Sequence, residues 1–173
     1  AAQSAPVPDH MRDDIRACQQ DTSFLLTENT TGDAAQQRGA APPTTPDALS
    51  TWMDENPDGT LVAGATDVGL WVTKNFRDLG PVAFLNRIPD LAGVVLTDDD
   101  IRIGAATTLS DLHSAITPHH PAFGELIRRY GSVQVRNAAT IGGNIANGSP
   151  IGDGSPALIA LGATLHLRSV NGA

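Results

Sequence analysis

Between residues 46 and 130 the chain carries short apolar segments separated by residues that favour turns. Three segments place apolar side chains at helical spacing and predict helices that begin near residues 46, 107 and 121. Four short apolar runs predict strands at residues 60–63, 81–85, 93–96 and 101–104, the last two forming a hairpin around an acidic turn. The pattern therefore predicts a domain of helices and short strands that begins near residue 46.

The first predicted strand runs directly into Gly64-Ala-Thr-Asp67, after which helical spacing continues from Val68 to about Phe76. In such a strand–turn–helix unit the helix start offers free N–H groups and its dipole, and a phosphate is the natural ligand. The turn matches neither the G-x-G-x-x-G nor the P-loop pattern. A simple N-cap role for Thr66 or Asp67 is the alternative. Asp67 would repel a phosphate unless it caps the helix and points away.

The stretch from Val135 to Pro156 holds five glycines and three asparagines. It has too few large apolar side chains to predict a core helix and too much Gly and Asn for an ordinary strand. Glycine lacks a Cβ atom, so another group can approach this backbone closely. A glycine-rich bulged strand that turns a corner is the alternative. Beyond it, the alternation around His166 predicts a strand over residues 164–168.

Residues 1–45 lack a sustained apolar pattern and predict a tether, with a short helix at about 9–20 and an apolar anchor at 24–26. The net charge of −8 argues against binding to nucleic acid or to an anionic membrane. No apolar run is long enough for a membrane span, and no secretory signal is visible. Cys18 is the only cysteine, which fits a reducing compartment and predicts a cytoplasmic protein.

Metal-binding and catalytic residues are not predicted anywhere in the chain. A single cysteine excludes Cys-based zinc and iron–sulfur sites within it. The acidic run Asp98-Asp-Asp100 and the pair His119-His120 are interpreted as exposed turns. No paired-carboxylate, Ser-His or Cys-His arrangement is present.

Two motifs together carry a family resemblance. G-A-T-D at residues 64–67, followed about 70 residues later by V-R-N-A-A-T-I-G-G-N-I-A-N-G-S-P-I-G-D-G-S-P, resembles the flavin domain of the molybdenum hydroxylases, of the xanthine dehydrogenase small-subunit type. The resemblance covers roughly residues 46–173. It implies an α+β fold, that of an FAD-binding domain of the vanillyl-alcohol-oxidase/PCMH type, with a small α/β subdomain and a larger subdomain of mainly antiparallel sheet. The resemblance further implies a domain truncated at its C-terminus relative to that family, with residues 1–45 as the tether from an iron–sulfur domain.

The resemblance also implies cofactor-binding residues by matching positions. The first loop would present backbone N–H groups to the FAD pyrophosphate from Leu61, Val62, Ala63, Gly64, Ala65, Thr66, Asp67 and Val68. The second would complete the cradle with Thr140, Gly143, Asn144 and Asn147, while Asp153 holds a sugar or ribityl hydroxyl and Tyr130 makes an aromatic contact. Ala65 stands where many relatives carry glycine, and we expect little harm if its φ is negative.

The implied activity is that of an oxidoreductase without catalytic acid or base in this chain. Electrons would pass from a molybdenum centre through [2Fe–2S] clusters to FAD and then to NAD⁺. The implied partners are a molybdopterin-binding large subunit and an upstream iron–sulfur domain, so neither the clusters nor molybdopterin would be bound by this chain. The alternatives are a stand-alone flavin reductase of similar fold and a non-catalytic fragment with an empty flavin cleft.

Overall fold

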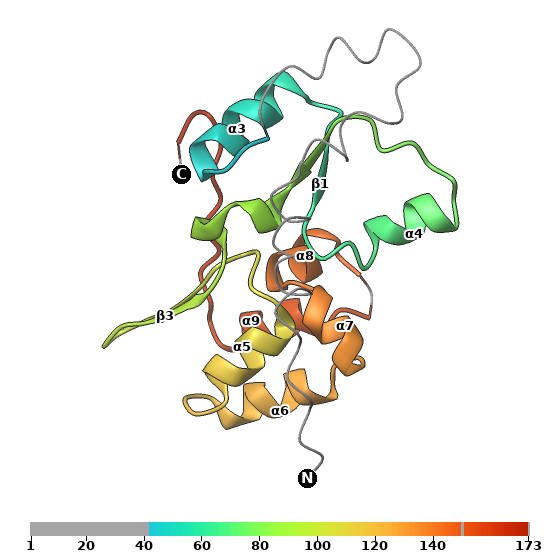
Figure 1. The fold of residues 1–173 in the computed structure, drawn as a ribbon. Coiled ribbons are helices and arrows are strands. Elements are labelled where there is room, and N and C mark those ends of the chain that lie inside the picture. The colour runs from blue at the N-terminus through green and yellow to red at the C-terminus, as the bar shows by residue number, and fades with distance from the viewer. Residues whose placement is uncertain (1–41, 150, 173) are drawn as a thin grey trace, which may run out of the picture. The chain divides into compact units, whose positions relative to one another are not determined.

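The computed structural model describes residues 42–149 and 151–172, and Figure 1 traces the elements that they form. The predicted helix at 9–20 and the anchor at 24–26 lie outside these residues. The first described helix, α3 (Pro46–Glu55), begins where the sequence predicts. Pro46 occupies its first turn, and Thr45 Oγ1 accepts a hydrogen bond of 3.2 Å from the Ala48 N–H.

Two predicted strands form a parallel pair. β1 (Thr60–Val62) lies beside β2 (Val82–Phe84), with Thr60 opposite Val82, and α4 (Val68–Thr73) lies in the connection between them. The helix ends three residues before the predicted Phe76, which has a left-handed φ of 51°. Because the strands are parallel, the loops that follow both of them leave from the same edge.

A first apolar cluster packs α3 against this pair. Leu49, Ala83 and Ile88 are buried in it, and Trp52 and Leu61 are packed against them. Ile88 lies between two short 3-10 turns, η2 (Leu85–Arg87) and η3 (Pro89–Leu91), which follow β2. The segment predicted as a loop after the second strand is therefore an ordered connection.

The second half of the described chain is mainly helical. The predicted hairpin is confirmed as antiparallel β3 (Val94–Leu96) and β4 (Ile101–Ile103). The predicted helices are confirmed as α5 (Leu109–Ile116) and α6 (Pro121–Arg129). They form a second apolar cluster with buried side chains Leu109, Leu112, Ile116, Phe123, Ile127, Ala139 and Ile141. No helix among the described residues is long and apolar enough to cross a membrane.

The Gly/Asn-rich stretch folds differently from the sequence interpretation. It is built from α7 (Val133–Ala138), α8 (Ile141–Ala146) and the start of α9 (Gly154–Ala160), so the interpretation that it excludes a core helix was wrong. Ser132 and Thr140 cap α7 and α8 through their hydroxyl groups, and Ile141 supplies the apolar contact. Good caps and one well-placed isoleucine outweigh the low helix propensity of glycine.

The strand predicted at residues 164–168 is also wrong. These residues are exposed and belong to no strand, and the described chain beyond α9 forms only an isolated bridge between Ser169 and Gly172. A strand needs a neighbour for its backbone groups. None of the described strands pairs with this segment, so its alternating pattern has nothing to pack on.

Candidate functional site

The two sequence motifs meet in the structure. Gly64, in the loop after β1, lies against the end of α7, where a Cβ atom at residue 64 would come within 1.8 Å of the Ala138 carbonyl oxygen. The Asp67 carboxylate accepts a hydrogen bond from the Asn147 side-chain amide, 80 residues later in the chain. Figure 1 shows the loop between β1 and α4 descending to the level of α8. The predicted proximity of the two motifs is therefore confirmed.

A pocket of about 230 Å³ opens where these segments meet. The loops after β1 and β2 form one wall, and the starts of α5 and α8 with the end of α7 form the other. The lining residues are Ala63, Gly64, Asn86, Ala106, Thr108, Asn137, Ala138 and Thr140. Ligands of α/β proteins bind in crevices outside the carboxyl ends of parallel strands, which is the position of this pocket.

The helical wall is held by its own backbone. Thr108 and Thr140 form an isolated antiparallel bridge at the starts of α5 and α8. Leu109 N–H donates to the Ala139 carbonyl at 2.9 Å, and Ile141 N–H donates to the Thr107 carbonyl at 3.0 Å. Gly142 N–H donates to the Ala105 carbonyl at 2.8 Å, and a Cβ atom at residue 142 would lie 2.6 Å from that oxygen. Close backbone contact thus explains this glycine better than contact with a ligand.

The loop after β1 differs from the helical wall in the hydrogen bonding of its backbone. Within the part of the chain that the structure describes, the backbone N–H groups of Gly64, Ala65, Thr66 and Asp67 donate no hydrogen bond. Ala65 has φ +56°, so the condition under which we expected it to be harmless, a negative φ, is not met. A left-handed residue turns successive N–H groups toward one side, as in the backbone nests that bind anions. Asp67 makes no cap to α4.

Thr140 is the predicted residue that reaches the pocket from the helical wall. It is only 6% exposed, and its Oγ1 accepts the Gly143 N–H at 3.1 Å. The hydroxyl hydrogen of Thr140 remains able to donate to a ligand. The Gly143 amide, by contrast, is already engaged in capping α8.

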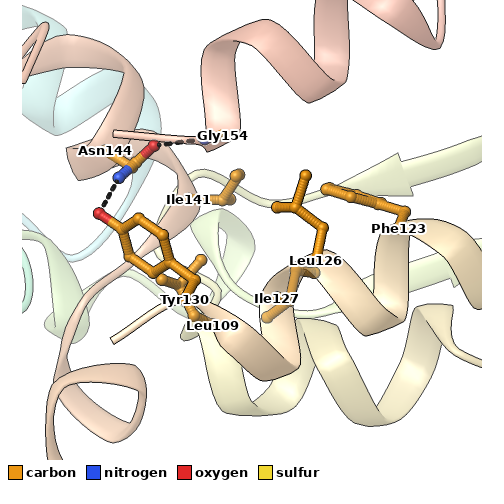
Figure 2. Close-up of a pocket in the computed structure, with 8 residues that line it drawn as sticks. All are labelled: Leu109, Phe123, Leu126, Ile127, Tyr130, Ile141, Asn144 and Gly154. Carbon is orange, nitrogen blue, oxygen red and sulfur yellow. Dashed lines mark hydrogen bonds between the residues drawn. The ribbon is translucent and has the colours of Figure 1, made fainter. Parts of the chain in front are cut away.

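Asn144 is engaged inside the protein. Figure 2 shows its side chain between Tyr130 and Gly154, with Nδ2 donating to the Tyr130 hydroxyl at 2.7 Å and Oδ1 accepting the Gly154 N–H at 3.0 Å. The hollow beside them measures about 10 Å³, which is at the lower limit of the room that one water needs. This network joins α6, α8 and α9, and neither Tyr130 nor Asn144 lines the 230 Å³ pocket.

The remaining predicted site residues lie around the pocket without lining it. Leu61 and Val62 belong to β1, where Leu61 packs on the first apolar cluster and Val62 is buried. Val68 is the first residue of α4, and Asp153 is exposed before α9. The structure therefore brings Ala63, Gly64 and Thr140 together and keeps Asp153 and Tyr130 outside the pocket lining.

Three polar lining residues were missed by the sequence interpretation. Asn86 is the second residue after β2, Thr108 precedes α5, and Asn137 lies in α7. A position immediately after a predicted strand was an available signal for Asn86. Among the described residues that line the pocket none is charged, so its donors are neutral amides, hydroxyl groups and the backbone.

Comparison with known proteins gives this geometry a context. Residues 36–173 match the family model of the FAD binding domain in molybdopterin dehydrogenase. The xanthine dehydrogenase FAD-binding subunit of Escherichia coli O157:H7 is 33% identical over 129 residues, covering 73% of this chain and 44% of that protein. The nicotinate dehydrogenase FAD-subunit of Eubacterium barkeri is 32% identical over 114 residues, covering 65% and 38%.

The fold comparison agrees. A chain of the reconstituted CO dehydrogenase from Oligotropha carboxidovorans superposes with a TM-score of 0.71 at 26% identity, covering 76% of this chain and 47% of that one. The chain spans less than half the length of these relatives. From the match over residues 36–173, the chain belongs to the family of FAD-binding domains found in molybdopterin dehydrogenases.

Proposed function

We propose that this chain binds FAD, with the dinucleotide's diphosphate at the pocket between the loop after β1 and the start of α8. The observation that carries the proposal is the run of backbone N–H groups from Gly64 to Asp67 that have no acceptor among the described residues. A diphosphate offers many acceptor oxygens and needs converging donors. Because the chain has a net charge of −8, neutral hydrogen-bond donors at close range, rather than many Lys and Arg side chains, would stabilise the bound diphosphate.

The donor set on the other wall fits the same ligand. Thr140 lines the pocket from a buried position, and its capping bond to Gly143 fixes its side chain. The contact between Gly64 and Ala138 sets the distance between the two walls, because no side chain separates the backbones there. Asp67 is held by Asn147, which restrains its carboxylate by a hydrogen bond.

The proposed role of the longer protein is that of a xanthine dehydrogenase-like oxidoreductase. Bound FAD would supply the redox chemistry, which in this proposal is electron transfer from iron–sulfur clusters to NAD⁺. The residues of this chain bind and orient the cofactor and perform no proton transfer. The proposed partners are an iron–sulfur domain and a molybdopterin-binding subunit, each holding its own cofactor.

Flavin binding is tested by titrating the purified chain with FAD and following flavin fluorescence and the absorbance of oxidised flavin. We expect saturable binding at one site per chain, and weaker binding for Thr140→Val, which keeps the size of the side chain and removes the hydroxyl. Ser155→Ala, at a half-buried hydroxyl in α9 outside the pocket lining, is the control. A chain that ignores added FAD at millimolar concentration contradicts the proposal. Iron and molybdenum that co-purify with the full-length protein would support the proposed partners.

A further inference from the structure

Two asparagine side chains line the pocket from opposite walls. Asn86 lies in η2, directly after β2, and Asn137 lies in the last turn of α7. The loop amides from Gly64 to Asp67 leave from the same sheet edge as Asn86, because β1 and β2 are parallel. The two side-chain amides therefore flank the place where the diphosphate is proposed to lie.

The hydrogen bonding of these amides leaves donors available. Ser110 Oγ donates to Asn137 Oδ1 at 2.5 Å, which anchors one end of the Asn137 amide. In the described chain its Nδ2 group has no acceptor, and the Asn86 side chain makes no hydrogen bond. Both side chains are exposed to solvent, so water satisfies them until a ligand arrives. A ligand that accepts hydrogen bonds can replace that water at low cost.

We infer that Asn86 and Asn137 bind a phosphate group of the dinucleotide and make the pocket prefer phosphate-bearing ligands over phosphate-free flavin. The inference rests on the proposed FAD binding and assigns residues and selectivity to that site. An Asn amide presents two N–H donors without charge, which suits phosphate oxygens in a pocket whose described lining has no cation. An aspartate in place of either asparagine should weaken phosphate binding, because a carboxylate offers no donor and repels the phosphate.

The test compares Asn86→Asp and Asn137→Asp with the unaltered chain. Each substitution keeps the size of the side chain and exchanges the donor group for negative charge, and a carboxylate at position 137 can still accept from Ser110. Asn171→Asp is the matched control, since Asn171 is exposed, lies outside the pocket lining and changes the net charge equally. Dissociation constants are measured for FAD, ADP and riboflavin, with ADP followed by calorimetry.

We expect each pocket variant to bind FAD and ADP at least ~10-fold more weakly, because one added charge acts on a phosphate at short range. Riboflavin binding should change by less than about twofold, and rising salt should reduce the loss for FAD, since salt screens exposed charges. Asn137→Ala, which removes donors without adding charge, should weaken FAD and ADP by a smaller factor. It keeps the inference testable if an Asp variant fails to fold.

Three results would overturn the inference. Equal weakening of FAD and riboflavin would mean that the asparagines do not contact phosphate. If the pocket variants bind FAD and ADP as well as Asn171→Asp does, Asn86 and Asn137 are not part of the binding site, although the chain still binds FAD. An unaltered chain that binds neither FAD nor ADP would overturn the proposed function and this inference together.

Discussion

Gly64 is the position where the smallest change in the chain should have the largest effect on the fold. Its φ lies outside the left-handed region, so the backbone conformation itself admits alanine. The obstacle is the Ala138 carbonyl oxygen, 1.8 Å from the position of an ideal Cβ atom, with the carbonyl carbon at 2.5 Å. Cβ contacts below 3.0 Å essentially never occur, so the two backbones must separate by roughly the 1.2 Å that is missing.

Gly64→Ala should lower the stability of the fold because two backbone segments must move apart. Overpacking usually costs about 1–3 kcal/mol, and here the contact joins two backbones, so no side-chain rotation can relieve it. We expect a loss of about 3 kcal/mol in the free energy of unfolding. Gly69→Ala is the matched control, because residue 69 lies inside α4 and a Cβ atom there meets nothing within 4 Å. That change should stabilise the chain by about 1 kcal/mol, the usual advantage of alanine over glycine in a helix.

Urea unfolding followed by circular dichroism measures both variants. In a chain of this size about 3 kcal/mol corresponds to a drop in Tm of roughly 6–12 °C. Gly64→Ala should also weaken FAD binding, since it separates the two walls of the pocket. If Gly64→Ala and Gly69→Ala shift stability in the same direction and by similar amounts, the contact between the two motifs does not exist as described.

Three further predictions concern other features of the chain. Ala65→Gly should stabilise the chain by roughly 0.5–1 kcal/mol in urea unfolding, because relief of the left-handed φ exceeds the added entropy of glycine in the unfolded state; a loss of stability would contradict this explanation. Asn144→Ala should lower the free energy of unfolding by about 2–3 kcal/mol, since it leaves the Tyr130 hydroxyl and the Gly154 N–H without their partner. Tyr130→Phe should lower it by less. If the loss in the double variant equals the sum of the two single losses, the two hydrogen bonds are not coupled. Hydrogen bonds from Arg128 and Arg129 lower the pKa of Glu125 to about 2 from 4.5, so this carboxylate stabilises the fold above pH 4.5 and loses that effect as the pH falls toward 2. Glu125→Gln should therefore lower Tm slightly at pH 7 and progressively less in acid, and a pH-independent difference would exclude the ion pairs as its cause.

Hydrophobic spacing located most of the elements because it reports which face of a segment is buried. Leu109, Leu112 and Ile116 predicted α5, and all three are buried in the second cluster. The same rule failed at residues 164–168, because alternation describes a strand's faces and says nothing about a partner strand. At α8 the composition argument failed because it weighed the glycines and gave no weight to the cap at Thr140 or to the packing of Ile141.

The site was predictable as a meeting of two motifs and less so as a set of contacts. The resemblance named Gly64 and Thr140, and both line the pocket. The resemblance did not identify Asn86 as a lining residue. Asn86 reaches the pocket because β1 and β2 are parallel, which places the end of β2 at the same sheet edge as the loop after β1. It also left open that the Asn144 amide is engaged by Tyr130 and Gly154, since that depends on how α6, α8 and α9 pack.

The two walls of the pocket should exchange their amide hydrogens at very different rates. The amides of Leu109, Ile141 and Gly142 are bonded to carbonyl groups across the wall, so deuterium should enter them only when that part of the chain opens. The amides from Gly64 to Asp67 lack such protection among the described residues and should label early. A bound diphosphate should therefore slow amide exchange in the loop after β1. In the opposite wall, where the amides are already protected, the exchange rates should hardly change.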